Sequence, residues 1–297
     1  MAVFNGYYIN LDRSPERRVH MEAEAQRLGI DWLQRFPAVD GRELTPGPDC
    51  LLSKGGLACF LSHLQIIETT PADSHTFVFE DDVQFSLDLP LALNLAEQGL
   101  FDDYDLVLLD CQPNLAVEVL STLCVCMKER CIGSDSFEDF AAPRRIHSVA
   151  LYDAAGMHAW GISSYMVTPK GHESLPPLMR ECLDRGPPGQ WDLLVRDACR
   201  DGRIRAAIVT PFLATPLLDS YADTTIDNRT QDDVKIRTAS AIRRMFFAGP
   251  ISGVERYAES LFDSETAAVA FKSPDRLMTQ LAGRVFEVLV EQKTFTL

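Results

Sequence analysis

The segment Phe77-Val78-Phe79-Glu80-Asp81-Asp82-Val83 is an apolar run that ends in three consecutive acids. The residues from Thr76 to Phe79 are β-branched or aromatic and predict a buried strand. In α/β sheets, ligands bind beyond the carboxyl ends of the strands. We therefore expect the three acids to lie at the edge of a sheet, where a ligand would bind.

The acidic triad has the chemistry of a site for a hard divalent metal ion. Three adjacent carboxylates repel one another unless a cation lies among them. Because side chains alternate along an extended segment, Glu80 and Asp82 should share one side and Asp81 should point away. Oxygen ligands suit a hard divalent ion that can also bind phosphate. A solvated acidic turn after the strand is the alternative. The motif alone does not favour either the metal site or the turn.

Strand-like and helix-like segments alternate on both sides of this motif. Residues 3–11 predict a first strand, and Ser14-Pro15 predicts an N-cap and the start of a helix that ends before Gly29. Further strands are expected over 32–36, 105–109, 162–167 and 205–209, and further helices over 56–70, 169–185 and 191–202. The opening order strand, helix, strand is typical of an α/β nucleotide-binding domain.

Two parts of the chain do not follow this alternation. Residues 111–150 lack clear periodicity, so we expect an irregular or inserted segment there. Its cysteines (Cys124, Cys126 and Cys131) are interpreted as free thiols rather than a soft-metal site, because their spacing lacks paired CxxC motifs. After Arg229, amphipathic stretches over 239–247 and 277–290 predict helices. The expected organisation is a domain over 1–228 and a helical C-terminal extension over 229–297.

The charge balance limits the partners that the chain can bind. Among 297 residues there are 43 Asp and Glu against 28 Lys and Arg, which gives a formal net charge of −15. Nucleic-acid binding relies on clustered Lys and Arg, so we expect no nucleic-acid partner. An anionic ligand would need a local positive charge, and a divalent cation is the simplest source of it.

The chain shows no sequence feature of a secreted or membrane-spanning protein. No basic region with an apolar stretch precedes the first strand, and no apolar run is long enough for a membrane span. We expect a cytoplasmic protein. Arg237, Arg243 and Arg244 beside Met245-Phe246-Phe247 could attach it peripherally to the inner face of the membrane. A helix that packs on the core is the favoured interpretation of this segment.

Three further places carry polar residues with more than one interpretation. Residues 10–18 follow the first strand, where polar groups and a helix N-terminus can bind a nucleotide, although their arginines could simply balance neighbouring acids. His63 lies on an expected helix, where a lone histidine is more often structural than catalytic. Asp192 can cap a helix or act as a base for an acceptor hydroxyl, and the residue alone favours the cap.

Taken in order, these motifs resemble glycosyltransferase family 25, which includes bacterial lipooligosaccharide galactosyltransferases and collagen galactosyltransferases. The resemblance covers about residues 3–228. It rests on Tyr8-Ile9-Asn10-Leu11-Asp12-Arg13-Ser14 with Arg17-Arg18, Ala38-Val39-Asp40-Gly41, Gly56 to His63, Phe79-Glu80-Asp81-Asp82-Val83, Gly161 to Gly171, Asp192 and Pro211. Ile67 stands where the family pattern has an aromatic residue, and residues 111–150 match none of its motifs.

The resemblance implies a GT-A type fold, which is a Rossmann-like nucleotide-sugar-binding domain with a mixed central sheet. It also implies that Asp82, assisted by Glu80 or Asp81, binds Mn²⁺ or Mg²⁺. The residues that would bind the nucleotide-sugar are Asn10, Leu11, Arg13, Asp40, Gly41, Ser62, His63, Glu80 and Asp81. Asp192 falls where such folds place the general base.

The function implied by the resemblance is a metal-dependent inverting hexosyltransferase. It would move a hexose, with galactose favoured, from a UDP-sugar to a hydroxyl of a glycan, glycolipid or lipooligosaccharide, as in lipopolysaccharide biosynthesis. The alternative is a catalytically degenerate relative that binds a nucleotide-sugar or glycan without transferring it. The intact acidic triad and the presence of Asp192 argue against that alternative.

Overall fold

The computed structural model describes residues 3–218, 234–256, 270 and 272–294, apart from residues 115, 133, 135, 144 and 147. Within them, the strands are β1 (Val3–Asn10), β2 (Leu33–Pro37), β3 (Ser74–Glu80), β4 (Val83–Phe85), β5 (Leu106–Leu108), β6 (Gln112–Pro113), β7 (Ala150–Asp153), β8 (His158–Trp160), β9 (Ser164–Val167), β10 (Ala206–Thr210) and β11 (Ala214–Pro216). The helices are α1 (Pro15–Leu28), α2 (Lys54–Thr69), α3 (Pro90–Glu97), α4 (Val117–Cys131), α5 (Phe137–Ala141), α6 (Ala154–Met157), α7 (Pro169–Asp184), α8 (Trp191–Arg200), α9 (Val234–Met245) and α11 (Pro274–Thr294), with 3-10 turns η1 (Gly41–Glu43) and η3 (Val254–Arg256).

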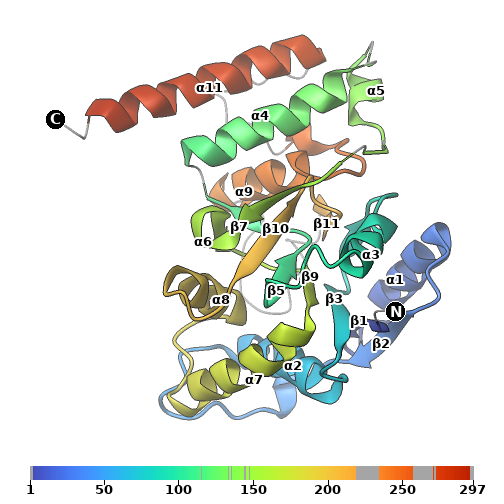
Figure 1. Cartoon of the computed structure of the whole chain (residues 1–297), viewed down its shortest axis with the longest axis vertical. Coiled ribbons are helices and arrows are strands. Elements are labelled where there is room, and N and C mark those ends of the chain that lie inside the picture. Colours follow the sequence, from blue (N-terminus) through green and yellow to red (C-terminus); the bar gives the residue numbers. More distant parts are fainter. Residues whose placement is uncertain are drawn as a thin grey trace.

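A seven-stranded sheet forms the centre of the molecule, in the order β2-β1-β3-β9-β5-β10-β7 (Figure 1). Strand β1 pairs in parallel with β2 and β3, and β5 pairs in parallel with β10. Strand β9 runs antiparallel between β3 and β5, and β7 runs antiparallel along the edge. The sheet is therefore mixed, as expected, and the parallel pair β1–β3 brings two carboxyl ends together at one edge.

Helices cover both faces of this sheet, which explains why its central strands are apolar throughout. Along β3, Phe77 and Phe79 belong to one hydrophobic cluster, and Val78 between them belongs to the other. Successive side chains of a strand point to opposite faces, so each face needs its own apolar layer. Helices α2, α7 and α8 contribute to the Val78 layer, and α1 and α3 contribute to the other.

Local signals set the helix boundaries near the carboxyl edge of the sheet. Pro15 begins α1, and Gly29 ends it with φ 67°, a left-handed conformation that glycine adopts without strain. Ser14 occupies the N-cap position, but its side chain makes no capping hydrogen bond, contrary to expectation. The backbone carbonyl of Ser14 accepts a hydrogen bond from the side-chain amide of Asn10, at 3.0 Å. Thr168 does cap α7, because its hydroxyl accepts from the Gly171 backbone N–H at 3.1 Å.

The expectation of irregular structure over 111–150 is wrong for its central part, where α4 and α5 lie. The buried face of α4 includes the polar residues Thr122 and Arg130, whereas Val125 is exposed. Because burial does not follow polarity here, the helical period is hidden in the sequence. Helix α11 lies beside α4 (Figure 1).

The expected helices of the C-terminal part are present as α9 and α11. The expected boundary at 228/229 lies outside the described residues, and the division into domains remains a prediction. Met245, Phe246 and Phe247 are fully buried, and Arg243 and Arg244 are 4% and 5% exposed. This segment packs in the core, so its interpretation as a membrane contact is wrong. No helix of the described part is long and apolar enough to cross a membrane.

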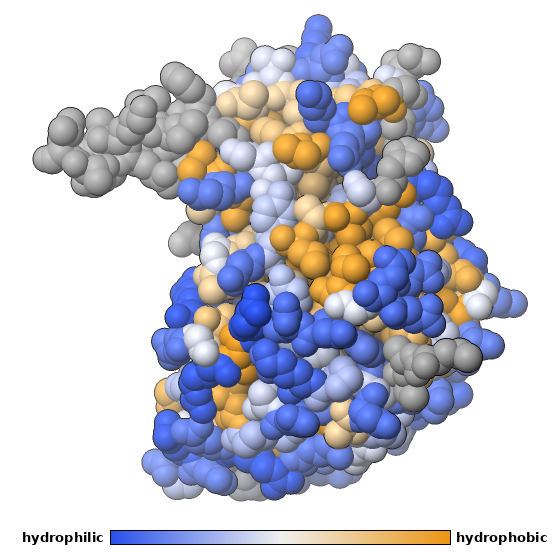
Figure 2. All heavy atoms as spheres, in the orientation of Figure 1, coloured by the Kyte–Doolittle hydropathy of each residue, from blue (hydrophilic) through white to orange (hydrophobic). Residues whose placement is uncertain are grey.

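The surface viewed in Figure 2 divides by hydropathy. Hydrophilic residues dominate the lower part, around α2 and α7, and hydrophobic residues gather higher up, near α3. All eight cysteines are free, which agrees with the interpretation of Cys124, Cys126 and Cys131 as thiols.

Candidate active site

A cleft opens at the carboxyl ends of β1 and β3, and contains about 910 Å³ of empty space, part of it open to solvent. Its walls come from the end of β1, the start of α1, the loop before η1, the first turns of α2 and the end of β3. Among the residues expected to bind a nucleotide-sugar, those in the wall are Leu11, Arg13, Gly41, Ser62, His63, Glu80 and Asp81. Asn10 and Asp40 stand behind the wall, in contact with residues that form it.

Asp81 turns away from Glu80 toward the first strand and helix. One of its carboxylate oxygens accepts from the Asn10 amide at 2.7 Å, and the other accepts from Arg17 at 2.9 Å. Asn10 is 1% exposed, so its amide is fixed in place. These contacts connect β1, α1 and β3, and they give Asp81 a positioning role that the acidic motif alone does not reveal.

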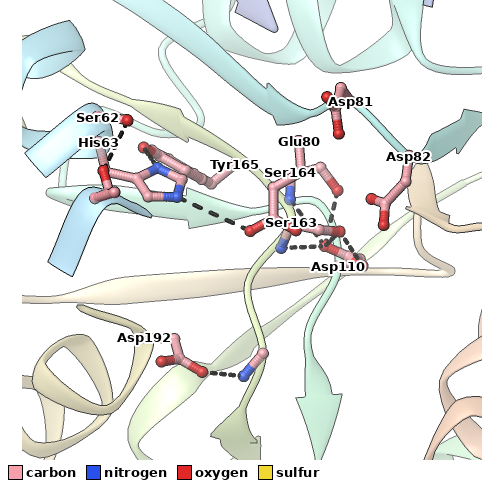
Figure 3. Close-up of polar contacts among 12 residues, drawn as sticks. Ser62, His63, Glu80, Asp81, Asp82, Asp110, Ser163, Ser164, Tyr165 and Asp192 are labelled. Carbon is pink, nitrogen blue, oxygen red and sulfur yellow. Dashed lines mark hydrogen bonds and ion pairs between the residues drawn. The ribbon is translucent and has the colours of Figure 1, made fainter. Parts of the chain in front are cut away.

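Glu80 lies on the other side of the triad, near the carboxylates of Asp82 and Asp110 (Figure 3). The pKa of Glu80 is raised well above its usual value, first by burial, then by the charge of Asp82 and, to a smaller extent, by the charge of Asp110. Arg243 opposes this shift. Asp82 also lies 3.8 Å from the Arg17 guanidinium. Negative charge therefore accumulates on this side of the triad.

Asp110, at the end of β5, is the most deeply buried acid of the group, with no exposed surface. Figure 3 shows its carboxylate held by Ser163 and Ser164, whose hydroxyls donate to it at 3.0 Å and 2.8 Å. Arg243 of α9 completes the arrangement with an ion pair to Asp110 and a hydrogen bond to the Ser163 hydroxyl, at 3.0 Å. Burial raises the pKa of Asp110, and Arg243 and the two serines lower it.

Basic side chains dominate the outer part of the cleft, although the chain as a whole is acidic. The basic residues in its wall are Arg13, Arg17, Arg42 and Lys54. Asp40 orients two of them, since its carboxylate accepts from Arg13 at 3.2 Å and from Arg42 at 2.6 Å. The hydrogen bonds from Arg42 hold the pKa of Asp40 well below its usual value.

The first turns of α1 and α2 also border the cleft, through Ser14 and Arg17 and through Lys54 and Gly55. Helix N-termini carry unpaired N–H groups and a positive partial charge, and together these favour anions. Two helix ends and the four basic side chains therefore form a local region that attracts anions in a chain of net charge −15.

Gly41 and Ser62 fix the wall between the η1 loop and α2. A Cβ on Gly41 would lie 2.6 Å from the Lys54 carbonyl oxygen, so only glycine allows this approach. The Ser62 hydroxyl accepts from the Val39 backbone N–H at 2.9 Å and donates to the Ala58 carbonyl at 2.8 Å. Ser62 therefore holds the loop on the helix, in addition to facing the cleft.

His63 is buried against two aromatic rings, those of Tyr165 and Trp191, and only one of its ring nitrogens has a hydrogen-bond partner among the described residues. Its ring stacks near Trp191, with centroids 4.3 Å apart, and Nδ1 lies 2.8 Å from the Tyr165 hydroxyl. Nε2 faces the Glu80 carboxylate at 4.0 Å. Burial lowers the pKa of His63 to about 3, so the imidazole is neutral near neutral pH.

Asp192 is not the N-cap of α8, so the N-cap interpretation that the sequence favours is wrong. The N-cap of α8 is Gln190, and Asp192 stands in the first turn, where its carboxylate accepts from the Gly161 backbone N–H at 2.5 Å. Figure 3 shows it apart from the acidic triad. It is 9% exposed and does not line the cleft.

The sequence analysis did not assign four residues of the site, which are Arg42, Lys54, Asp110 and Arg243. The position of Asp110 at the end of an expected strand was a usable signal, because it repeats the arrangement of the Glu80 segment. Lys54 and Arg243 carried no such signal. Arg243 reaches the site from α9, more than 130 positions along the chain from Asp110.

Comparisons of the sequence with known proteins identify the family of the chain. The sequence model described as glycosyltransferase family 25 (LPS biosynthesis protein) matches residues 4–182. The chain therefore belongs to glycosyltransferase family 25. Proteins described as "Glycosyltransferase 25 family member" from Aedes aegypti and Anopheles gambiae are 36% and 34% identical to it, over 104 and 98 residues.

These matched regions cover 29% and 27% of the chain, and 17% and 16% of the two mosquito proteins. A Drosophila melanogaster protein of the same description is 34% identical over 98 residues. The matched region thus spans about a sixth of the length of these relatives. The family match includes the acidic triad and ends before Asp192 and Arg243.

Proposed function

We propose that the protein is a metal-dependent inverting hexosyltransferase with a GT-A type domain. The donor is a UDP-sugar, with galactose the favoured hexose, and the acceptor is a hydroxyl of a glycan, glycolipid or lipooligosaccharide. The observation that carries this proposal is the juxtaposition, in one cleft, of basic side chains with the Glu80 carboxylate at the end of β3. A nucleoside diphosphate sugar combines the anionic and metal-binding groups that such a cleft would accommodate.

The residues present fit a hard divalent ion. Glu80, Asp82 and Asp110 supply oxygen ligands, and the pKa of Glu80 is raised first by burial and then by the negative charge of Asp82, which a bound cation would offset. Arg243 already forms an ion pair with Asp110, so Asp82 and Glu80 are the better candidates for ligands. Bound there, Mn²⁺ or Mg²⁺ would offset the charge that develops on the diphosphate leaving group.

The protein residues would share the remaining work of the reaction. Arg13 and Arg42, oriented by Asp40, would hold the diphosphate together with Lys54 and the helix N-termini. The acceptor oxygen would form a bond to the anomeric carbon as the bond from that carbon to the diphosphate oxygen breaks, with inversion. The acceptor proton would pass to Asp192, a step typically worth about 10²–10⁴-fold in rate.

Asp192 would need to come closer to the cleft for this role, because its carboxylate now holds the Gly161 N–H. Gly161 has φ 67° and follows directly on β8, so the contact lies at a turn. Active sites commonly tighten when the substrate binds, which would bring this carboxylate closer to the acceptor. An Asp192→Asn variant with normal UDP binding and a large loss of transfer would support the assignment.

Hydrolysis of nucleotide-sugars in the presence of Mn²⁺ tests the proposal without requiring an acceptor. We expect the protein to hydrolyse one UDP-hexose slowly, UDP-galactose first among them, and chelation to stop the reaction. An Asp103→Ala variant, which changes an exposed acid outside the cleft, serves as a control. Binding of UDP-sugars without turnover of any donor, with or without a panel of glycan acceptors, would indicate the degenerate relative instead.

A further inference from the structure

The inner wall of the cleft contains a group of potential metal ligands that differs from the acidic triad. Cys59, His63 and Glu80 each direct one ligand atom toward a common point, and these atoms all lie within 4.8 Å of one another. All three residues line the cleft, so an ion can reach them from solvent. In the described part of the chain, no other group of three His, Cys, Asp or Glu side chains brings its ligand atoms this close together.

The helix explains why two of these ligands converge. Cys59 and His63 are four positions apart on α2, and residues at this spacing lie on the same face of a helix. Helical metal sites use the same spacing for paired ligands. Glu80 supplies the third ligand from the end of β3, which is held by a hydrogen bond from its backbone N–H to the Ser163 carbonyl, at 2.8 Å.

The distances favour an ion over a direct contact between His63 and Glu80. Nε2 of His63 lies 4.0 Å from the Glu80 carboxylate, which is too far for a hydrogen bond. Nε2 is buried and has no hydrogen-bond partner. Zinc binds nitrogen and oxygen ligands at about 2.0–2.2 Å, so one ion can span such a gap after shifts of roughly 1 Å or less.

The surroundings of His63 resemble those of a metal-binding histidine. Its other nitrogen, Nδ1, is paired with the Tyr165 hydroxyl at 2.8 Å, and Trp191 packs on the ring. Metal-ligating histidines usually donate the second N–H to such a partner, which orients the ring and directs the lone pair of the first nitrogen at the metal. Tyr165 therefore has the place of an outer-shell partner.

We propose that Cys59 Sγ, His63 Nε2 and a Glu80 carboxylate oxygen form a zinc site in the cleft wall. The donor set of one sulfur, one nitrogen and one oxygen suits Zn²⁺, whereas Mn²⁺ and Mg²⁺ prefer oxygen ligands. Three protein ligands leave a fourth position for water. Binding releases the thiol proton of Cys59 to solvent, because the ligand is the thiolate.

This site would make zinc an inhibitor of donor binding. Glu80 is common to the zinc site and to the acidic group with Asp82, so occupation by Zn²⁺ withdraws one carboxylate from the manganese site. The zinc site itself depends on the three residues alone. Only its inhibitory effect rests on the proposed transferase function.

Cobalt binding to the reduced full-length protein tests the ligand set, since Co²⁺ replaces Zn²⁺ and reports on its ligands by absorption. We expect one equivalent of Co²⁺ to give a sulfur-to-cobalt charge-transfer band that Zn²⁺ abolishes. Cys59→Ser should remove the band and weaken zinc binding by more than the roughly 10–100-fold typical of losing an outer-shell partner. Tyr165→Phe should give a loss within that range.

Two variants separate this site from other thiols and acids. Cys182→Ser changes another partly buried helical cysteine and should keep the band. Asp82→Asn should lose Mn²⁺-dependent UDP binding yet keep the band. The absence of a charge-transfer band in the wild type, or a band that survives Cys59→Ser, would overturn the zinc site. Absence of any UDP-sugar turnover, with the band intact, would count against the transferase function only.

Alkylation of the unmodified protein gives a test that requires no variant. We expect Zn²⁺ to slow the alkylation of Cys59 at least tenfold, as located by mass spectrometry, with no change at Cys182 or with Mn²⁺ in place of Zn²⁺. Equal rates at Cys59 with and without Zn²⁺ would contradict the proposal.

Discussion

Arg243 of α9 forms a buried ion pair with Asp110 at the end of β5, beside the acidic triad. Arg243 is 4% exposed and Asp110 is not exposed at all. The segment that supplies the arginine lies beyond the family match. Its charge nevertheless acts on the site, since Arg243 opposes the rise that burial causes in the pKa of Glu80 and Asp110. The C-terminal part of the chain therefore contributes directly to the electrostatics of the candidate active site.

Removal of this arginine should destabilise the fold. Arg243→Gln leaves the Asp110 carboxylate buried without its cation, a change that typically costs about 3–5 kcal/mol. Urea denaturation at neutral pH measures the loss. The double variant with Asp110→Asn should lose clearly less than the sum of the two single variants, because the residues share one interaction. Strict additivity of the two losses would show that the pair is not coupled.

The buried His63 predicts a fall in stability on the acid side of neutrality. Its pKa is lowered from 6.5 to about 3, so the folded state stays unprotonated where the unfolded chain takes up a proton. This effect is absent above pH 6.5 and grows as the pH falls toward 3. Between pH 7 and pH 5 it amounts to roughly 2 kcal/mol in the free energy of unfolding.

A comparison of His63→Gln with wild type at pH 7 and pH 5 checks this effect. The variant should lose about 2 kcal/mol less than wild type on acidification, whatever its stability at pH 7. Gln65→Ala, at an exposed position of the same helix, should respond to pH as wild type does. An unchanged pH response in His63→Gln would show that His63 is not held neutral by burial.

The approach of the η1 loop to α2 predicts contrasting effects of two glycine substitutions. Gly41→Ala introduces a Cβ 2.6 Å from the Lys54 carbonyl oxygen, and such overpacking typically costs about 1–3 kcal/mol. It should also weaken UDP binding, because Lys54 and Arg42 shift with the wall. Gly47→Ala meets no atom within 4 Å and should be neutral. Thermal unfolding and calorimetric titration with UDP measure both effects, and equal behaviour of the two variants would contradict the account.

The basic side chains of the outer cleft should determine the affinity for the diphosphate. Arg42→Gln removes a donor that Asp40 holds in place, and we expect the Kd for UDP to rise roughly tenfold or more. Arg203→Gln, at a partly exposed arginine that pairs with Glu181 away from the cleft, should leave the Kd unchanged. Similar UDP affinity in wild type and Arg42→Gln would remove Arg42 from the donor site.

Much of the α/β core could be predicted from sequence because its signals are local. The apolar run before Glu80, Pro15 and Gly29 around α1, and Thr168 before α7 all depend on neighbouring residues. The mixed pairing of the sheet could not be predicted from periodicity. Only the family resemblance indicated that the sheet contains antiparallel as well as parallel strands. Helix α4 escaped prediction because its buried face includes polar residues that pair with distant groups, as Arg130 does with the Phe247 and Gly249 carbonyls.

The site was predictable where one motif supplies the residues and not where distant segments meet. Glu80 and Asp81 lie in the cleft as expected, because their strand delivers them there. The partners that set their electrostatics, Arg17 and Arg243, are fixed by tertiary packing that sequence spacing does not encode. The position of Asp192 against Gly161 likewise follows from the packing of α8 beside β8.

The assignment of Asp82 as a metal ligand is the central claim, and a thermal shift experiment tests it most directly. With Mn²⁺ and a UDP-sugar at about 100 times Kd, wild type should gain about 2.7 kcal/mol, or roughly 5 °C in Tm. Asp82→Ala should lose the part of this shift that depends on Mn²⁺, and Asp103→Ala should keep it. An unchanged manganese-dependent shift in Asp82→Ala would contradict the metal assignment.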